Sequence, residues 1–455
     1  MFRSLLIANR GEVAVRVARA ARELGIRTVG IASEADLNAS WTRQLDRVVC
    51  IGPSAPRDSY LRTDRIIQAA VQEGCSAVHP GWGFLAENSV FAALCSQHGL
   101  TFIGPGPGIM ERLGLKIPAK TAMKAAGLAG IPGSDGLLET LEEAKAVAES
   151  IGFPVILKAD AGGGGRGMRR CYAPDELANA WSQASAESLA AFGNGALYME
   201  SYLTGGRHIE FQILADNFGN AVHLGDRECS VQRNHQKLIE ESPSPVLSDK
   251  ERSELGQRAA QAAASIGYSG AGTVEFLRAP DGQMYFMEMN ARLQVEHPVT
   301  EVVTGIDLVK EQLRIAANES LGMTQADVTC KGASIECRIN AEDPTNNFRP
   351  TPGKLDVFEL PTDIGPGKLR VDTHLEQGDE VPPYYDSLLA KLIAYGDTRA
   401  EAIETMLNTL AATRIEGVAT TLPLHVAVLS SEAFRKGDYD TASIPGWEAG
   451  APTAG

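Results

Sequence analysis

Side chains able to bind metal ions and anions recur along one strand-like segment, YFMEMNARLQVEHPVTE, at residues 285–301. Successive side chains of an extended chain point to opposite sides. The spacing therefore predicts five polar residues on one face: Glu288, Asn290, Arg292, Gln294 and Glu296. The opposite face carries Met287, Met289, Leu293 and Val295. Two carboxylates beside amides and a guanidinium could bind a metal ion and an anion together.

A further carboxylate lies upstream, in AGTVEFLRAPDGQMYFME at 271–288, where a turn around Asp281 and Gly282 joins two strand patterns. A hairpin about this turn pairs positions whose numbers sum to 563, so Glu275 faces Glu288 (275 + 288). Carboxylates about 5 Å apart on one sheet face repel unless a cation lies between them. Oxygen ligands, with Asn290 beside them, suit Mg²⁺ or Mn²⁺. The alternative is a solvated face whose acids bind nothing.

Four glycines, at 162–165, follow a strand pattern that contains Lys158, in FPVILKADAGGGGRGMRRC. Backbone N–H groups of a loop without Cβ atoms can close around phosphate oxygens, and the loop can move as a lid. We expect Lys158, and Lys116 in RLGLKIPAK, to add positive charge for a nucleotide. The glycines assigned to this role are Gly163, Gly164 and Gly165. The alternative is a flexible hairpin tip.

The densest basic segment outside the N-terminal helix is DRECSVQRNHQKLIEE, at residues 226–241. Its basic residues are Arg227, Arg233, His235 and Lys237. Because the chain as a whole is acidic, we expect this segment to face an anion. The alternative is a surface ribbon in which neighbouring acids, Asp226 and Glu228, neutralise the positive charge.

The 455-residue chain has 44% hydrophobic and 22% charged residues and a formal net charge of −15. This composition predicts a globular protein with about three domains. The charge argues against nucleic-acid and anionic-membrane partners, which require a basic face. Seven scattered cysteines, with no C-x-x-C pair, indicate neither a zinc site nor a disulfide framework and suit a reducing compartment. No span approaches membrane length, so we expect a cytoplasmic enzyme.

The predicted elements indicate mixed α/β and α+β architecture. A βαβ unit over 3–33 begins a parallel α/β sheet, extended by strand patterns at 77–81 and 101–105 and a helix between them. We assign this sheet to an N-terminal domain over residues 1–113.

The pattern changes after this sheet. Hairpins are predicted near 153–172, 208–226 and 271–290, in a second domain over 114–330. The rest is predicted to be a largely β domain over 331–446, with a surface helix at 397–413, and a flexible tail over 447–455.

Taken together, these residues resemble the biotin carboxylase family of ATP-grasp enzymes. The similarity runs from about residue 2 to 445, through IANRGE, HPGWGFLAEN, KADAGGGGRGM, RHIEFQ, QRNHQKLIEESP, EMNARLQVEHPVTE, ECRINAEDP and PPYYDS. QVEHPVTE and RINAEDP are particularly characteristic, whereas the glycine run is shared more widely among ATP-grasp proteins. The resemblance implies an ATP-grasp domain with a mobile glycine-loop lid over about 131–203, between biotin carboxylase N-terminal-like and C-terminal-like domains.

The resemblance implies ATP-dependent carboxylation of biotin with bicarbonate, through carboxyphosphate, as the first half-reaction of a biotin-dependent carboxylase. It assigns ATP binding to Lys116, Lys158, Glu200, Leu203, His208, Gln232 and His235. It assigns the metal ion to Glu275 and Glu288, with Asn290 beside them. It assigns the bicarbonate pocket to Lys237, Arg292, Gln294, Val295 and Glu296, and it places Arg338 against biotin.

The chemistry of these residue types agrees with the resemblance. Glu296 could take the proton of bicarbonate while the guanidinium of Arg292 holds the anion. Metal ion and lysines would offset charge on the phosphoryl group. Carboxyphosphate would give CO₂ and phosphate, which deprotonates biotin, and Arg338 would stabilise the enolate. Without the resemblance, SIECRINAE favours an ordinary strand-face arginine paired with Glu336 or Glu342.

Biotin is carried on a lysine within a Met-Lys-Met turn, and the sequence shows no such turn; TAMKAAG at 121–127 lies in a helical pattern. We therefore expect a biotin carrier that acts in trans or belongs to a longer polypeptide, and separate carboxyltransferase subunits. The final acceptor is not encoded in these motifs; we favour acetyl-CoA, and hence fatty acid biosynthesis, over propionyl-CoA or pyruvate. A homodimer is expected from the resemblance alone.

Two other functions fit parts of the pattern. Another ATP-grasp ligase, such as a purine-pathway carboxylase or half of a carbamoyl phosphate synthetase, would share the glycine loop and the acidic pair. It gives no reason for Arg338. A regulatory subunit that binds ATP without turnover is expected to lose a metal ligand or the base, and all of Glu275, Glu288, Arg292 and Glu296 are present.

Overall fold

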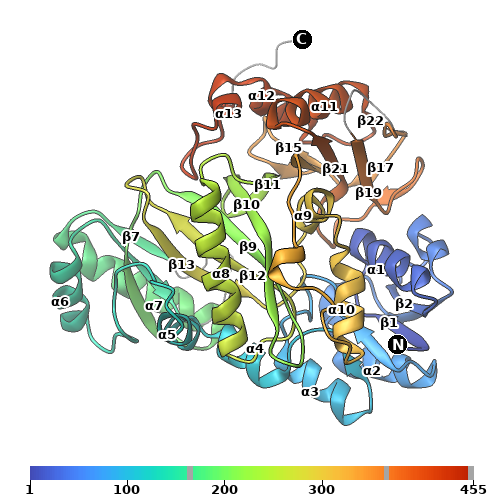
Figure 1. Cartoon of the computed structure of the whole chain (residues 1–455), viewed down its shortest axis with the longest axis horizontal. Helices are drawn as coiled ribbons and strands as arrows, with labels where there is room; N and C mark the ends of the chain where they lie inside the picture. The colour runs from blue at the N-terminus through green and yellow to red at the C-terminus, as the bar shows by residue number, and fades with distance from the viewer. Residues whose placement is uncertain (161–167, 363–367, 449–455) are drawn as a thin grey trace.

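A five-stranded parallel sheet forms the N-terminal part of the chain. The computed structural model describes residues 1–160, 168–362 and 368–448. The strand order is β3-β2-β1-β4-β5, and the parallel pairing of β1 with β2 confirms the predicted βαβ unit. The elements of this part, at the lower right of Figure 1, are β1 (Ser4–Ile7), α1 (Gly11–Glu23), β2 (Arg27–Ser33), β3 (Arg47–Gly52), α2 (Thr63–Gln72), β4 (Ala77–His79), α3 (Ser89–Gln97) and β5 (Thr101–Phe102).

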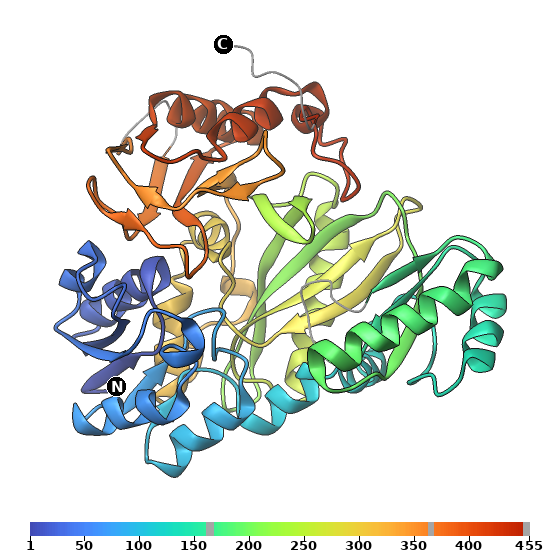
Figure 2. The ribbon, with the colours of Figure 1, turned by 180° about the vertical axis from the view of Figure 1, so that it is seen from behind.

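An eight-stranded antiparallel sheet runs through the middle of the molecule (Figures 1 and 2). Its order is β13-β12-β9-β10-β11-β14-β21-β19, so strands from both sides of residue 330 belong to one sheet. The pairing of β9 with β10 and of β12 with β13 confirms two predicted hairpins. The strands are β9 (Arg207–Ala215), β10 (Ala221–Arg233), β11 (Gln236–Ser242), β12 (Gly270–Arg278), β13 (Met284–Asn290), β14 (Ala333–Asn340), β19 (Lys368–Thr373) and β21 (Leu388–Gly396).

A three-stranded sheet, ordered β7-β6-β8, lies at the left end of Figure 1. Antiparallel pairing of β6 with β7 confirms the hairpin predicted near 153–172. The glycines between these strands, Gly163 to Gly165 among them, lie outside the described residues. The elements of this sheet and its covering helices are α6 (Leu141–Ile151), β6 (Val155–Ala159), β7 (Arg169–Cys171), α7 (Leu177–Phe192) and β8 (Leu197–Ser201). Helices α4 (Pro107–Gly114) and α5 (Lys116–Ala125) pack on β13 instead.

Helix α8 (Asp249–Ser265) covers one face of the central sheet (Figure 1). It begins with a capping box, in which Ser248 Oγ accepts the N–H of Glu251 and the Glu251 carboxylate accepts the N–H of Ser248. At Gly256 the helix lies close to β10, because an added Cβ there would lie 2.4 Å from Nδ1 of His223. Glycine therefore allows α8 to pack on the sheet that carries the site described below.

The remaining elements connect and cover the sheets. The predicted helix at 397–413 is present as α11 (Arg399–Ala412), which packs on β21 with one side buried. The other helices are α9 (His297–Thr304), α10 (Leu308–Ala316), α12 (Leu422–Ser430) and α13 (Glu432–Lys436), with short 3₁₀ helices at Ser40–Gln44, Pro56–Asp58, Pro174–Glu176 and Gln325–Asp327. The short strands are β15 (Glu342–Asp343), β16 (Arg349–Pro350), β17 (Gly353–Lys354), β18 (Val357–Glu359), β20 (Glu380–Val381) and β22 (Arg414–Glu416).

Two features predicted for residues 271–301, the register of the 271–290 hairpin and the strand face of 285–301, differ in the structure. Glu275 pairs with Glu288 as predicted, but from Phe276 onward the partner numbers sum to 562, because an irregularity at Met287 shifts the register. The prediction of one strand face through residue 296 is wrong, because β13 ends at Asn290. The chain turns there to begin α9, and the backbone carbonyl of Gln294 accepts the N–H of His297.

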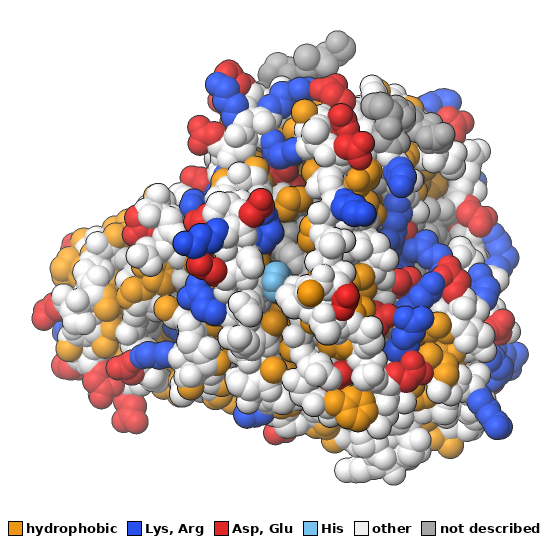
Figure 3. Space-filling view, viewed as in Figure 1, with side chains coloured by type: hydrophobic (Ala, Val, Ile, Leu, Met, Phe, Trp, Pro, Cys, Tyr) orange, Lys and Arg blue, Asp and Glu red, His pale blue; other side chains and the backbone are white. Residues whose placement is uncertain are grey.

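The helices show no sign of a membrane-spanning segment within the described ranges, since none of them is both long and apolar enough to cross a bilayer. On the face seen in Figure 3, acidic and basic side chains are interspersed over the described atoms.

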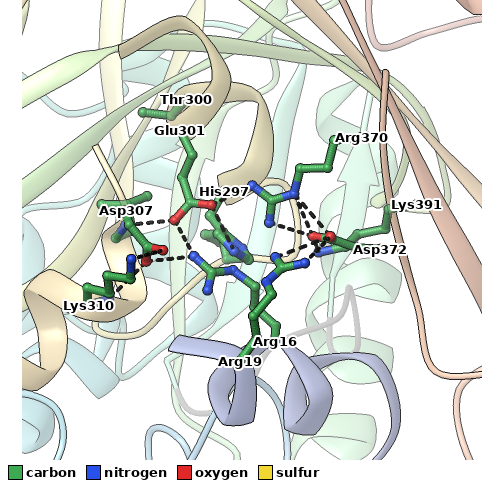
Figure 4. Close-up of polar contacts among 12 residues, drawn as sticks. Arg16, Arg19, His297, Thr300, Glu301, Asp307, Lys310, Arg370, Asp372 and Lys391 are labelled. Atoms are coloured by element: carbon green, nitrogen blue, oxygen red, sulfur yellow. Dashed lines mark hydrogen bonds and ion pairs between the residues drawn. The ribbon is translucent and has the colours of Figure 1, made fainter. Parts of the chain in front are cut away.

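Buried ion pairs tie the N-terminal sheet unit to α9, α10 and the far strands of the central sheet (Figure 4). Arg16 of α1 donates from Nη2 to Glu301 Oε1 and to Asp307 Oδ1, both at 2.7 Å. Arg370 of β19 donates to the other oxygen of Glu301 at 2.7 Å. The side chains of Arg16 and Glu301 are 1% and 6% exposed, so this pair is shielded from water. Glu301 therefore connects α1 with β19.

We expect Arg16→Met to lower the free energy of unfolding by about 3 kcal/mol, because it leaves the buried carboxylate of Glu301 with one cation fewer. Chemical unfolding followed by circular dichroism measures the change. The control is Arg43→Met, because Arg43 and its partner Glu376 are 66% and 62% exposed, and we expect it to cost less than about 1 kcal/mol. Equal effects of the two substitutions would contradict a stabilising role of the Arg16 pairs.

Candidate active site

Four charged side chains form a row across four neighbouring strands of the central sheet. Arg227 of β10 lies opposite Glu210 of β9, Glu210 lies opposite Glu275 of β12, and Glu275 lies opposite Glu288 of β13. Side chains opposite each other in an antiparallel pair share a face and lie about 5 Å apart. Three carboxylates in succession therefore require cations. The row itself contains one cation, Arg227, at its β10 end.

Lys237 supplies a cation to the middle of this row. It lies on β11, and its Nζ donates to Glu210 at 2.6 Å, to Glu275 at 3.2 Å and to Glu296 at 2.5 Å. Burial would lower the pKa of Lys237, but these three carboxylates raise it well above its usual value. Burial would raise the pKa of Glu275, but Lys237 and His208 hold it well below its usual value. Both groups are therefore charged at neutral pH.

Lysines from the neighbouring small sheet and α5 approach the other acids. Lys116, the first residue of α5, contacts Glu288. Lys158 of β6 donates to Glu200 of β8 at 2.5 Å, and Lys120 contacts the other oxygen of Glu200. Burial would raise the pKa of Glu200, but Lys158 and Lys120 lower it. In this arrangement the lysines predicted to bind phosphates are paired with carboxylates.

The loop after β13 brings the predicted anion-binding residues back to the same acids. Arg292 donates to Gln294 Oε1 at 2.9 Å and to Asn290 Oδ1 at 3.2 Å. Gln294 and Asn290 in turn donate to Glu275 Oε1 at 3.1 and 2.8 Å. Glu87, from the loop before α3, accepts from Arg292 Nε at 2.9 Å. These residues cluster through loop geometry and not through the strand periodicity that predicted them.

Glu296 lies between two cations at the end of this loop. Its carboxylate, 1% exposed, accepts from Lys237 at 2.5 Å and from Arg338 Nη2 at 2.8 Å. Burial would raise the pKa of Glu296, but Lys237 and Arg338 lower it. Arg338 also contacts Glu240 of β11.

The alternative partners suggested for Arg338, Glu336 and Glu342, are wrong. Glu342 accepts the hydroxyl of Ser387, and Glu336 makes no ion pair with Arg338. The partners of Arg338 come from distant parts of the chain.

The remaining predicted site residues lie around this cluster. His208 Nε2 is 3.0 Å from Glu275 Oε2, and the backbone carbonyl of Val295 accepts from Lys391 at 3.0 Å. Leu203 is half-buried in the loop after β8. Gln232, the second-last residue of β10, lies opposite Lys237 of β11, and His235 is exposed in the β10–β11 turn. Among the described side chains, no hydrogen bond or ion pair joins Leu203, Gln232 or His235 to the acids.

The prediction that Arg227 faces an anion is wrong. Its guanidinium is 0% exposed and donates to Glu210 at 2.5 Å, to Gln212 at 2.8 Å, to Thr300 at 3.0 Å and to Thr273 at 3.1 Å. The guanidinium is thus fully occupied inside the fold.

The sequence analysis did not predict three charged residues of the cluster, namely Glu87, Lys120 and Glu210. Glu210 had a signal, because RHIEFQ alternates polar and apolar residues as the Glu288 segment does. Glu87 and Lys120 had none, since they approach from other elements.

The residues fit a divalent cation and a nucleotide. Glu275 and Glu288 face each other with their carboxyl oxygens next to lysines that can meet phosphates. His208, Glu210 and Glu275 also bring ligand atoms within 4.8 Å of one another, but Lys237 Nζ already lies against two of them. The Glu275 and Glu288 pair is therefore the better place for a metal ion.

Comparisons with known proteins give the family. The chain matches "Biotin carboxylase, N-terminal domain" over residues 1–110, "Carbamoyl-phosphate synthase L chain, ATP binding domain" over 116–324 and "Biotin carboxylase C-terminal domain" over 336–445. It is 50% identical over 442 residues to biotin carboxylase 1 of Bacillus subtilis (strain 168), covering 97% of this chain and 98% of that one. It is also 47% identical over 441 residues to the 2-oxoglutarate carboxylase small subunit of Hydrogenobacter thermophilus, covering 97% and 93%.

A solved structure agrees with the sequence matches. The biotin carboxylase domain dimer of Hydrogenobacter thermophilus 2-oxoglutarate carboxylase, in complex with MgADP, ADP and bicarbonate, superposes with a TM-score of 0.93. The two sequences are 47% identical, and the superposition covers 97% of this chain and 96% of the Hydrogenobacter chain. The chain belongs to the biotin carboxylase family of ATP-dependent ligases, which confirms the resemblance and the mixed α/β fold with its N-terminal parallel sheet.

We expect Arg227→Met to lower the free energy of unfolding by about 3–5 kcal/mol, because it leaves Glu210 buried with one cation fewer. Thermal and urea unfolding measure the loss. The double substitution Arg227→Met with Glu210→Gln should recover part of it, because the unpaired charge is removed. Unchanged stability of Arg227→Met alone would contradict a stabilising role of the buried Arg227–Glu210 pair.

Proposed function

We propose that this chain catalyses the first half-reaction of a biotin-dependent carboxylase with the residue roles set out here. The observation that carries the proposal is Glu296, a buried carboxylate held between Lys237 and Arg338 next to the Glu275 and Glu288 pair. The substrates would be ATP, bicarbonate and biotin on a carrier. The three units predicted over 1–113, 114–330 and 331–446 would contribute to this one site.

ATP would be bound by the lysines and polar groups next to the acidic row. The residues assigned to it are Lys116, Lys158, Glu200, Leu203, His208, Gln232 and His235, with Gly163, Gly164 and Gly165. The phosphates would replace carboxylates as partners of Lys116 and Lys158, which lie at 24% and 21% side-chain exposure. Glu275 and Glu288, with Asn290 beside them, would hold Mg²⁺ or Mn²⁺, which offsets charge on the phosphates.

Bicarbonate would bind against Lys237, Arg292, Gln294, Val295 and Glu296. Its negative charge would draw Lys237 and Arg292 away from their carboxylates, and this would raise the proton affinity of Glu296. Glu296 could then accept the proton of bicarbonate, and the carbonate oxygen would attack the γ-phosphate to form carboxyphosphate. The low pKa of Glu296 keeps it ionised, and so able to accept a proton, before bicarbonate arrives.

Arg338 would face the ureido group of biotin. Carboxyphosphate would decompose to CO₂ and phosphate, the phosphate would take the N–H proton of biotin, and the guanidinium of Arg338 would stabilise the enolate oxygen. The ureido nitrogen would then attack CO₂ and form the C–N bond of carboxybiotin. An ATP-grasp ligase that does not act on biotin would not need an arginine at this position.

The partners are proposed from the family. Biotin would come on a carrier protein or domain, the carboxyl group would pass to a carboxyltransferase, and the chain would form a homodimer, as the biotin carboxylase domain of the Hydrogenobacter enzyme does. Acetyl-CoA as final acceptor, and with it fatty acid biosynthesis, stays a prediction, because relatives of similar identity include subunits of pyruvate and 2-oxoglutarate carboxylases. A cytoplasmic location also stays a prediction, since several relatives are chloroplastic.

The test is bicarbonate-dependent ATP hydrolysis with and without free biotin. We expect biotin to stimulate turnover in the wild type and not in Arg338→Ala, which should still bind ATP because Arg338 makes no contact with Lys116, Lys158 or Glu288. Carboxybiotin formation from labelled bicarbonate is the second readout. ATP turnover that ignores both bicarbonate and biotin would exclude the proposal.

A further inference from the structure

Two buried glutamates face each other beside Arg338. Glu240 of β11 lies directly opposite Glu336 of β14 in the antiparallel ladder, so both side chains share one face. Each is 0% exposed. The oxygens of both carboxyl groups accept no hydrogen bond of normal geometry from the described residues, apart from the ion-pair contact of Glu240 with Arg338. Two buried carboxylates at this spacing repel each other strongly.

The surrounding cations are not sufficient to neutralise both groups. Glu240 faces Arg338 and, at longer range, Lys237, but both of these also pair with Glu296. Glu336 faces Lys391 of β21 and, less strongly, the same Arg338, without an ion pair to either. Lys391 Nζ is already engaged with Glu12 at 3.1 Å and with the carbonyl of Val295 at 3.0 Å.

The other ionisable groups nearby add no cation. Cys337 of β14 and Cys229 of β10 are buried thiols, and burial raises their pKa well above the usual value. From α9, His297 is buried and neutral, because burial and the nearby Lys391 hold its pKa well below the usual value. Glu301 of α9 is paired with Arg16 and Arg370.

We propose that Glu240 and Glu336 share one proton, held by Glu336, and that the ionised Glu240 is the permanent counter-ion that positions Arg338. Glu336 would donate its proton to a Glu240 oxygen, and Glu240 would keep its charge because it contacts the guanidinium. The inference rests on the proposed function only for what Arg338 does to biotin. The protonation state itself stands on the geometry of the pair.

A fixed counter-ion matters because the other partner of Arg338 changes charge. Arg338 Nη2 bridges Glu240 and Glu296. When Glu296 accepts the proton of bicarbonate, its attraction for Arg338 falls, and Glu240 alone keeps the guanidinium on the biotin side. Glu240 and Glu336 are thus positioning residues, because they act on biotin through Arg338.

The direction of the pKa shifts agrees with this assignment. Burial raises the pKa of Glu336 well above its usual value, and Lys391 offsets this only in part, while Glu240 adds to it. Burial also raises the pKa of Glu240, to about 7, although Arg338 opposes that rise, so the charge of Glu240 depends on its contact with the guanidinium. A raised folded-state pKa gives stability that is fully present below the unfolded value of about 4.3 and is lost as pH rises through the folded value.

The test uses an asymmetry between two isosteric substitutions. Glutamine mimics a protonated glutamate, so Glu336→Gln should keep biotin-stimulated turnover within about twofold of the wild type. Glu240→Gln removes the counter-ion and should lower biotin-stimulated turnover by about tenfold or more. Bicarbonate-dependent ATP hydrolysis without biotin should fall much less, and Glu240→Asp should recover part of the loss. A general structural defect would lower both rates together.

Infrared spectroscopy and pH-dependent unfolding test the shared proton directly. The wild-type minus Glu336→Gln spectrum at neutral pH should contain the carbonyl stretch of a protonated carboxyl group, shifted in D₂O. Glu241→Gln is the control. Glu241 is the next residue of β11 and pairs with Arg399, so the spectrum of this variant should still contain the band. As pH rises, the wild type should lose stability relative to Glu336→Gln.

Each outcome decides between the two proposals. A missing infrared band, or equal loss of activity in Glu336→Gln and Glu240→Gln, would overturn the shared-proton inference while biotin carboxylation by the wild type stands. Absence of biotin stimulation in the wild type would instead overturn the proposed function and leave the infrared result unaffected.

Discussion

The row of carboxylates across β9, β12 and β13 is the constraint on which the rest of the site depends. Glu210, Glu275 and Glu288 lie on one face of neighbouring strands, about 5 Å from one to the next, and such a row is unstable without cations. Arg227 meets it at one end and Lys116 at the other, while Lys237 enters the middle. The sheet thereby holds a concentrated negative charge ready for a metal ion.

The central sheet also carries the second charge cluster, because its strands continue without interruption from β9 to β14. Lys237 and Glu240 lie on β11, and Arg338 lies on the neighbouring β14. Glu296 touches both Lys237 and Arg338, so the acidic row and the arginine assigned to biotin are joined through one carboxylate. A change of charge on Glu296 therefore changes the electrostatic interactions of both Lys237 and Arg338.

Local patterns predicted what depends on neighbours in the sequence. The 271–290 hairpin and the pairing of Glu275 with Glu288 followed from alternation and a turn only a few residues away. The irregularity at Met287 and the end of β13 at Asn290 did not follow from such patterns. In this region β13 packs against α5, and the N–H of Phe286 donates to the distant carbonyl of Ala129.

Local sequence patterns could not predict contacts between strands that are distant in the sequence. Glu240 and Arg338 are 98 positions apart (338 − 240) and meet only because β11 pairs with β14. The burial of Arg227 likewise depends on the register with β9, which places Glu210 opposite it. The resemblance to biotin carboxylases supplied the assigned role of Arg338, but not its partners.

The most direct measurement of the central claim is the effect of Mg²⁺ on ADP affinity, by calorimetric titration of the wild type and of Glu288→Gln. If the paired acids hold the metal ion against the nucleotide, Mg²⁺ should tighten ADP binding in the wild type and have little effect in Glu288→Gln, whatever the affinity without metal. An equal gain from Mg²⁺ in both proteins would contradict the account.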